Sequence, residues 1–149
     1  MSTLEGDLEE QQQRNLRLRA DFENFRRRAA REYAGARDEG RRAALLPLLS
    51  VFDTLERALA AGSIDPEFYE GVAATQRLFL RALREAGAEP IESVGRPFDP
   101  TAHEAIATVP AEGVPPGTVA QENRRGWRLG PDLLRPAQVV VATEPEPAD

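Results

Sequence analysis

The chain has 149 residues, a formal net charge of −6 and no cysteine. Its length suits one ordinary domain or two small ones, and the missing cysteines exclude disulfides and thiolate chemistry. The acidic balance argues against nucleic-acid binding. We find no signal peptide and no apolar run near the roughly 18 residues that a membrane span needs. The sequence therefore predicts a cytoplasmic protein without membrane contact.

Residues 1–44 have the composition of a long helix. Good helix formers dominate residues 4–44, which hold no proline. Seam positions recur at spacings of four and three, as in a heptad repeat. They are Leu4, Leu8, Gln11, Asn15, Leu18, Phe22, Phe25 and Ala29. One helix cannot bury such a stripe alone, so we predict a coiled coil with a second copy, with Leu18, Phe22 and Phe25 in the dimer contact.

Residues 45–87 predict two short helices. Apolar residues from Leu45 to Leu59 mark one helical face, and residues 60–63 end that helix. Asp65 before Pro66 starts the second helix, and Gly87 stops it. Two short helices make too small a core, so we predict a four-helix bundle formed on dimerisation. The predicted bundle contacts are Leu48, Phe52, Leu55, Gly71 and Phe79, where Gly71 allows close approach of the helices.

Residues 88–142 predict a small all-β domain. Short β-like runs at 105–109, 118–122, 127–129 and 138–142 alternate with proline and glycine. About 55 residues is near the lower limit for independent folding, so we expect support from the bundle. Residues 143–149 are acidic and rich in proline, which predicts a disordered tail. The whole chain is therefore predicted to be α+β.

No motif predicts catalysis. The single histidine, His103, lies near Asp99 and Glu104, but one histidine with scattered carboxylates does not supply the converging ligands of a metal site. The simpler interpretation is a turn that starts at Asp99 and is held by local hydrogen bonds. No glycine-rich loop has phosphate-binding spacing. We therefore expect no enzyme activity, no metal, no cofactor and no direct nucleotide binding.

Two arginine-rich places have alternative interpretations. Residues 26–28 are all arginine, and on a helix they form either solvated surface, with pairs such as Glu23–Arg27, or a contact for a partner. Trp127 is either a core residue of the β domain or a binding hot spot, because Trp and Arg dominate the energetics of interfaces. Its neighbours Arg124, Arg125 and Arg128 are expected to be exposed and to make contacts.

Several motifs in this order resemble the GrpE family, the nucleotide exchange factors of bacterial Hsp70 (DnaK). The resemblance covers about residues 14–142. The motifs are Phe22-Glu23-Asn24-Phe25-Arg26-Arg27-Arg28, the run from Leu48 to Leu59, Gly95-Arg96-Pro97-Phe98-Asp99-Pro100, His103-Glu104-Ala105, Val114-Pro115-Pro116-Gly117-Thr118-Val119, Gly126-Trp127 and Leu134-Arg135-Pro136-Ala137.

The resemblance implies a parallel homodimer with paired long helices, a four-helix bundle and two β wings. It also implies that one wing inserts against the ATPase domain of Hsp70, opens the nucleotide cleft and speeds ADP release. A rival hypothesis is a coiled-coil scaffold whose β domain binds another protein. Such a scaffold would have no reason to carry the motifs at 98–103 and 115–117.

The resemblance also implies which residues contact Hsp70. They are Arg26 on the long helix, Arg57 on the bundle, and Asn123, Arg124, Arg125, Gly126, Trp127 and Val141 in the β domain. Three departures from the family pattern matter, and one of them is an N-terminus shorter than the family often has. Asn123 stands where some members have an apolar residue, and Gly35 stands where a basic contact can occur.

Overall fold

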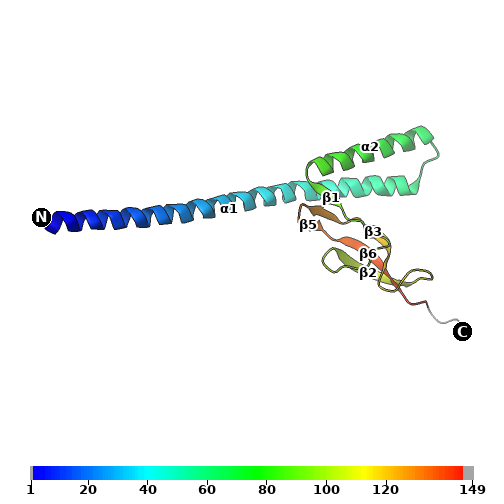
Figure 1. The fold of residues 1–149 in the computed structure, drawn as a ribbon. Coiled ribbons are helices and arrows are strands. Elements are labelled where there is room, and N and C mark those ends of the chain that lie inside the picture. The colour runs from blue at the N-terminus through cyan, green and yellow to red at the C-terminus, as the bar shows by residue number, and fades with distance from the viewer. Residues whose placement is uncertain (1, 146–149) are drawn as a thin grey trace. The chain divides into compact units, whose positions relative to one another are not determined.

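A computed structural model describes residues 2–145, with two helices followed by six short strands (Figure 1). The α+β class is confirmed. The elements are α1 (Ser2–Ala61), α2 (Pro66–Glu85), β1 (Ala88–Pro90), β2 (His103–Pro110), β3 (Val119–Arg124), β4 (Trp127–Leu129), β5 (Asp132–Arg135) and β6 (Ala137–Thr143). The chain divides into two compact units, residues 1–41 and 42–149.

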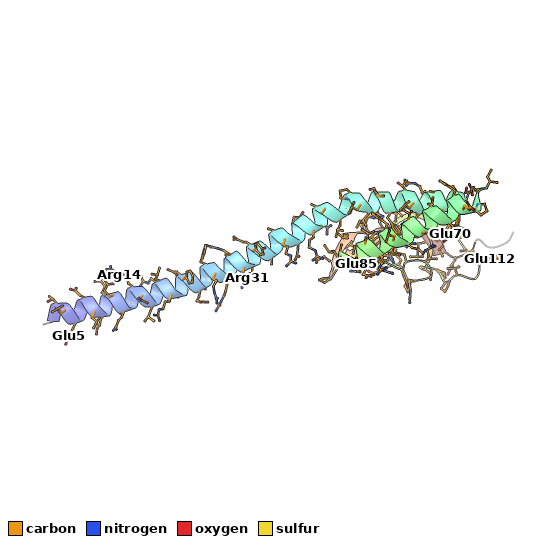
Figure 2. All side chains as sticks on the ribbon, turned by 90° about the horizontal axis from the view of Figure 1, so that it is seen from above. Glu5, Arg14, Arg31, Glu70, Glu85 and Glu112 are labelled. Atoms are coloured by element: carbon orange, nitrogen blue, oxygen red, sulfur yellow. The ribbon has the colours of Figure 1, made fainter. Side chains whose placement is uncertain are left out.

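The first unit is the N-terminal part of α1, and its helical prediction is confirmed. Side chains project all around this segment, Arg14 and Arg31 among them (Figure 2). The predicted seam is open to solvent in the single chain, with Phe22 61% exposed, so this helix fits a coiled coil. Arg26 pairs with Glu23 at 3.2 Å, where the sequence predicted Arg27 as the partner of Glu23.

Helix α1 continues through the place where two helices were expected to meet. Pro47 lies inside α1, which runs unbroken to Ala61. The first of the two short helices predicted for residues 45–87 is therefore the C-terminal part of α1. The second is α2, which begins as predicted: the Asp65 carboxylate accepts hydrogen bonds from the backbone N–H of Glu67 (2.9 Å) and Phe68 (3.2 Å).

The six strands of the described residues form two sheets of three. The first sheet has the order β1–β4–β5 with antiparallel neighbours, and pairs Ala88 with Leu129. The second has the order β2–β6–β3, in which β6 runs parallel to β2 and antiparallel to β3. The four predicted strands match β2, β3, β4 and β6, while β1 and β5 were not predicted. Strand β6 includes Thr143, the first residue of the predicted tail, and residues 146–149 lie outside the described part.

The expected turn at Asp99 is confirmed. The backbone N–H of His103 donates to the carbonyl of Asp99 at 2.8 Å, and the His103 ring Nδ1 accepts from the Asp99 N–H at 3.0 Å. The Asp99 carboxylate accepts from the backbone and the hydroxyl of Thr101, which lowers the pKa of Asp99. His103 is buried, and the hydrogen bond that its ring accepts from Asp99 closes a turn at the start of β2.

The main core lies where α1 and α2 meet the first sheet. Its buried members are Leu45, Leu49, Phe52, Leu83, Ala88, Trp127, Leu129 and Leu134. Residues distant in the chain thus share one apolar cluster, and the predicted support of the β domain by the helices has a physical basis. A smaller cluster of Val119, Ala137 and Val139 lies in the second sheet.

Candidate functional site

The first sheet packs against two turns of α1. Leu49 and Phe52 on α1 are fully buried. The Phe52 ring meets the edge of Trp127 with centroids 5.1 Å apart and planes at 84°. This edge-to-face arrangement is favoured by the ring quadrupoles and adds about 0.5–1.5 kcal/mol to the burial of the rings. The apolar contact therefore holds β4 directly against α1.

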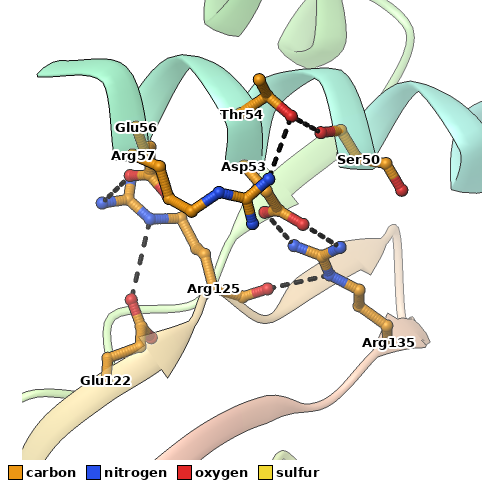
Figure 3. Close-up of polar contacts among 8 residues, drawn as sticks. All are labelled: Ser50, Asp53, Thr54, Glu56, Arg57, Glu122, Arg125 and Arg135. Carbon is orange, nitrogen blue, oxygen red and sulfur yellow. Dashed lines mark hydrogen bonds and ion pairs between the residues drawn. The ribbon is translucent and has the colours of Figure 1, made fainter.

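An ion pair stands beside this apolar contact. The guanidinium of Arg135, at the end of β5, donates through both terminal nitrogens to the Asp53 carboxylate on α1, at 2.8 and 2.5 Å (Figure 3). Its Nε donates to the backbone carbonyl of Arg125 at 2.9 Å. The side chains of Arg135 and Asp53 are only 11% and 13% exposed. One side chain therefore joins three segments: α1, β5 and the connection between β3 and β4.

Arg125 makes the second link between α1 and the sheets. Its guanidinium pairs with Glu56 of α1 at 2.7 Å and with Glu122 of β3 at 3.7 Å (Figure 3). It also lies over the Phe52 ring, 5.7 Å from the centroid, within the range of a cation–π contact. We call Asp53, Glu56, Glu122, Arg125 and Arg135 the helix–sheet clamp. It combines three acids with two arginines on one side of the apolar core.

The surroundings of the clamp raise the pKa of the Glu56 carboxyl group. Burial raises the pKa of Glu56 above its ordinary 4.5, and the carboxylates of Glu122 and Asp53 act in the same direction. The guanidinium groups of Arg125 and Arg135 oppose that rise. Desolvation is the largest of these effects, so the folded clamp holds the Glu56 proton more tightly than the unfolded chain does.

The raised pKa of Glu56 predicts a pH dependence that Glu56→Gln removes. A carboxyl group whose pKa is higher in the folded state contributes stability below its unfolded pKa, and this contribution is lost as pH rises through the folded pKa. The free energy of unfolding of the wild type should therefore fall relative to that of Glu56→Gln as pH rises above about 4.5. Urea unfolding of both proteins at one concentration, from about pH 4 to pH 7, measures this difference. A wild-type free energy of unfolding that stays constant or rises relative to that of Glu56→Gln as pH increases would contradict the assignment.

The structure places the eight predicted partner contacts in different surroundings. Arg57 on α1 is exposed and donates to the Thr54 hydroxyl at 3.2 Å (Figure 3). Asn123 on β3 is exposed, and Arg26 is exposed in the first unit. Arg124 and Val141 are half-buried. Within the second unit, Arg57 and Asn123 are therefore the predicted contacts most open to a partner, and their role remains a prediction.

Three of the predicted contacts are buried or engaged within the chain. Trp127 is 0% exposed and lies in the core against Phe52, so it cannot meet a partner in this conformation. Gly126 is buried, and a Cβ there would stand 2.5 Å from the backbone nitrogen of Ala137, so glycine serves close packing of two segments. Arg125 is engaged within the chain by Glu56 and Glu122 rather than presented as an exposed contact.

The predicted dimer contacts also differ in how far they are buried within the single chain. Leu48 is exposed, while Leu55 and Phe79 are half-buried. Phe52 is 1% exposed and lies in the core of its own chain, and its role in the dimer contact stays a prediction. A Cβ at Gly71 would meet nothing within 4 Å in the single chain, so no neighbour in its own chain requires glycine there.

Sequence reasoning missed the acidic half of the clamp. Asp53 and Glu56 follow Phe52 on the same helical face, and Arg135 stands in the Leu-Leu-Arg-Pro segment that ends β5. Charged residues flanking a buried aromatic residue on a helix were the available signal. They pointed equally to solvated surface, because their partners lie about 70–80 residues away in the chain.

The described residues offer few other candidate sites. Among residues 2–145, no three His, Asp or Glu side chains gather closely enough to hold a metal ion. No helix in that part of the chain combines the length and the apolar character that crossing a membrane requires. The helix–sheet clamp and the exposed residues beside it are therefore the candidate site carried forward.

Comparison with known proteins gives one consistent result. A family model described as GrpE matches residues 1–143. Protein GrpE of Legionella pneumophila (strain Corby) is 38% identical over 146 residues, which cover 97% of this chain and 73% of that protein. Protein GrpE of Geobacillus kaustophilus (strain HTA426) is 40% identical over 145 residues, covering 95% and 68%. Protein GrpE of Geobacillus thermodenitrificans (strain NG80-2) is 42% identical over 132 residues, covering 87% and 60%.

Proposed function

We infer the function of this chain from the GrpE family, to which it belongs and whose members are co-chaperones that exchange nucleotide on DnaK. The chain binds the ATPase domain of its cognate cytoplasmic Hsp70 as a homodimer and accelerates ADP release there. The family match over residues 1–143 is the observation that carries this proposal. The exchange factor makes and breaks no covalent bond. It acts on protein folding and the stress response by returning Hsp70 to its ATP-bound state.

The proposed mechanism is differential binding. The factor binds the open conformer of the ATPase domain more tightly than the closed one, so it shifts the population towards the open cleft. ADP favours the closed conformer. By thermodynamic linkage, the exchange factor and ADP must therefore weaken each other's binding by the same factor.

The second unit offers a surface that suits this mechanism. Arg57 on α1 and Asn123 on β3 are both exposed, and both belong to elements that meet at the helix–sheet clamp. We propose that these two residues contact the ATPase domain, while Trp127 and Gly126 support the surface from inside. Arg26 is proposed as a separate contact on the first unit.

The exposed seam of the first unit supports the homodimer. Leu18, Phe22 and Phe25 are each more than half exposed in the single chain, and a second copy in a coiled coil would cover them. Light scattering at micromolar concentration should give twice the chain mass. A monomeric mass would argue against the dimer.

The proposal predicts faster release of labelled ADP from the cognate Hsp70 in stopped-flow mixing. The rate should rise with the concentration of the exchange factor and reach a plateau. Arg57→Ala should raise the half-saturating concentration several-fold, because a charge at an interface rim contributes mostly to encounter and to the salt dependence of binding. Arg77→Ala, on the exposed Arg77–Glu70 pair of α2, is the matched control. A wild-type protein that leaves ADP release unchanged at saturation would favour the scaffold hypothesis instead.

A further inference from the structure

We propose that the helix–sheet clamp contains positioning residues for nucleotide exchange, with Arg135 and Asp53 as its principal pair. The clamp fixes the orientation of the β1–β4–β5 sheet on α1, so that contacts carried by the helix and by the β domain reach Hsp70 together. This inference rests on the proposed function and assigns a role to side chains that touch no partner.

The apolar core restrains this orientation through close packing and the edge-to-face contact of Phe52 with Trp127. Burial itself depends on area rather than direction, so a directional polar contact adds to this restraint. A bidentate guanidinium–carboxylate pair is directional, since its two parallel hydrogen bonds hold two planar groups in one geometry. Arg135 forms such a pair with Asp53, at 2.8 and 2.5 Å. The clamp therefore adds a second angular restraint to the one that the packed core provides.

The arginine contacts of the clamp are made within the chain, although Glu122 Oε2 is buried without a hydrogen-bond partner among the described residues. Arg135 uses its two terminal nitrogens on Asp53 and its Nε on the carbonyl of Arg125. Arg125 in turn holds Glu56 and Glu122 from two different elements. Both arginine side chains are one-third exposed or less. The clamp is therefore formed before Hsp70 binds and acts through the residues around it.

The residues that the clamp orients are its immediate chain neighbours. Arg57 follows Glu56 on α1, and Asn123 follows Glu122 on β3. Both neighbours are exposed, and both are proposed Hsp70 contacts. A change in the angle between α1 and the sheets would alter the separation of these two contacts. The orientation that the clamp imposes thus reaches each proposed contact through one peptide bond, from Glu56 to Arg57 on α1 and from Glu122 to Asn123 on β3.

A positioning role and a purely structural role predict different kinetics. If the clamp only stabilised the fold, its loss would lower the fraction of active molecules, which raises the half-saturating concentration but leaves the plateau rate unchanged. If it positions the contacts, a folded and bound variant favours the open conformer less strongly, and the plateau rate itself falls. The maximum rate of ADP release therefore separates the two roles.

The test is stopped-flow release of labelled ADP from the cognate Hsp70 with the full chain carrying Arg135→Lys. Lysine keeps the charge but loses the planar fork that binds Asp53 bidentately. We expect the plateau rate to fall about five- to tenfold, within the usual range of coupling between two sites, and the half-saturating concentration to change less than about twofold. Arg84→Lys, on the exposed Arg84–Glu89 pair, is the control and should keep the wild-type plateau. Circular dichroism and light scattering establish that each variant is folded and dimeric at the assay temperature.

Each outcome is decisive. Three results would overturn the positioning role and leave the proposed function standing. The first is a plateau rate for Arg135→Lys equal to that of an active wild type, and the second is a rise in the half-saturating concentration alone. The third is an equal loss of plateau rate in Arg84→Lys. A wild type without exchange activity would overturn both. A second variant, Asp53→Asn, guards against a local effect of lysine. Combined with Arg135→Lys it should lower the plateau little further, because both changes break the same contact.

Discussion

Replacing Trp127 by alanine should lower the free energy of unfolding by about 3–5 kcal/mol, the range observed when a large buried aromatic side chain is removed from a core. The loss follows from three features. Trp127 is fully buried, its ring meets Phe52 edge to face, and the same cluster joins both helices to the first sheet. We expect the thermal midpoint to fall by on the order of 10 °C. Thermal unfolding followed by circular dichroism at fixed protein concentration measures the change.

Two further variants calibrate the Trp127→Ala result. Trp127→Phe should lose about half as much stability, because it keeps an aromatic edge, and the indole N–H has no hydrogen-bond partner among the described residues. Val94→Ala, at an exposed position of the β domain, should change stability by less than about 0.5 kcal/mol. If Trp127→Ala unfolded at nearly the wild-type temperature, the ring would not carry the junction between helices and sheet.

Gly126→Ala should destabilise the chain by about 3 kcal/mol, at the upper end of the usual cost of overpacking. The added Cβ would lie 2.5 Å from the backbone nitrogen and 2.9 Å from the Cβ of Ala137. A backbone atom cannot move aside as a flexible side chain can. The start of β6 would have to separate from the β3–β4 connection, beside Arg125. Chemical unfolding of wild type and variant at equal concentration provides the measurement.

Gly35→Ala is the control for the glycine substitution. Gly35 lies inside α1, where a Cβ would meet nothing within 4 Å, so alanine should stabilise the helix by about 0.5–1 kcal/mol. The two changes are chemically identical and are predicted to have opposite signs. A Gly126→Ala protein as stable as the wild type would show that the segments around Ala137 can separate at little cost.

Local signals in the sequence were enough for most of the fold. The cap at Asp65 and the proline after it placed the start of α2, and the alternation of β-formers with turn residues placed four of the six strands. Strands β1 and β5 have three and four residues. Runs so short carry no periodicity, and only pairing with β4 makes them strands. The continuation of α1 through Pro47 was equally beyond a local prediction, because proline is a signal for a helix boundary.

The candidate site was predicted only in part, because its geometry depends on distant pairing. The sequence left Trp127 open between core and interface, and Phe52 from α1 decides the question by covering its ring. Arg125 carried the signature of an exposed contact, yet Glu56 from α1 and Glu122 from β3 engage it. Asp53 and Arg135 each lie in a motif that carries the family resemblance, but nothing in the sequence around either residue indicates that they pair. Their pairing across 82 positions exists only once the sheet has been placed on the helix.

The order of strands in the second sheet has a consequence for how the chain is made. Strand β6, the last strand among the described residues, lies in the middle of that sheet, and β2 and β3 pair with β6 rather than with each other. During synthesis the N-terminal segments leave the ribosome first. The helical segments can therefore form while β2 and β3 still lack their shared neighbour. The second sheet can therefore be completed only after β6 has been synthesised, so a product terminated before β6 would carry the helices without that sheet.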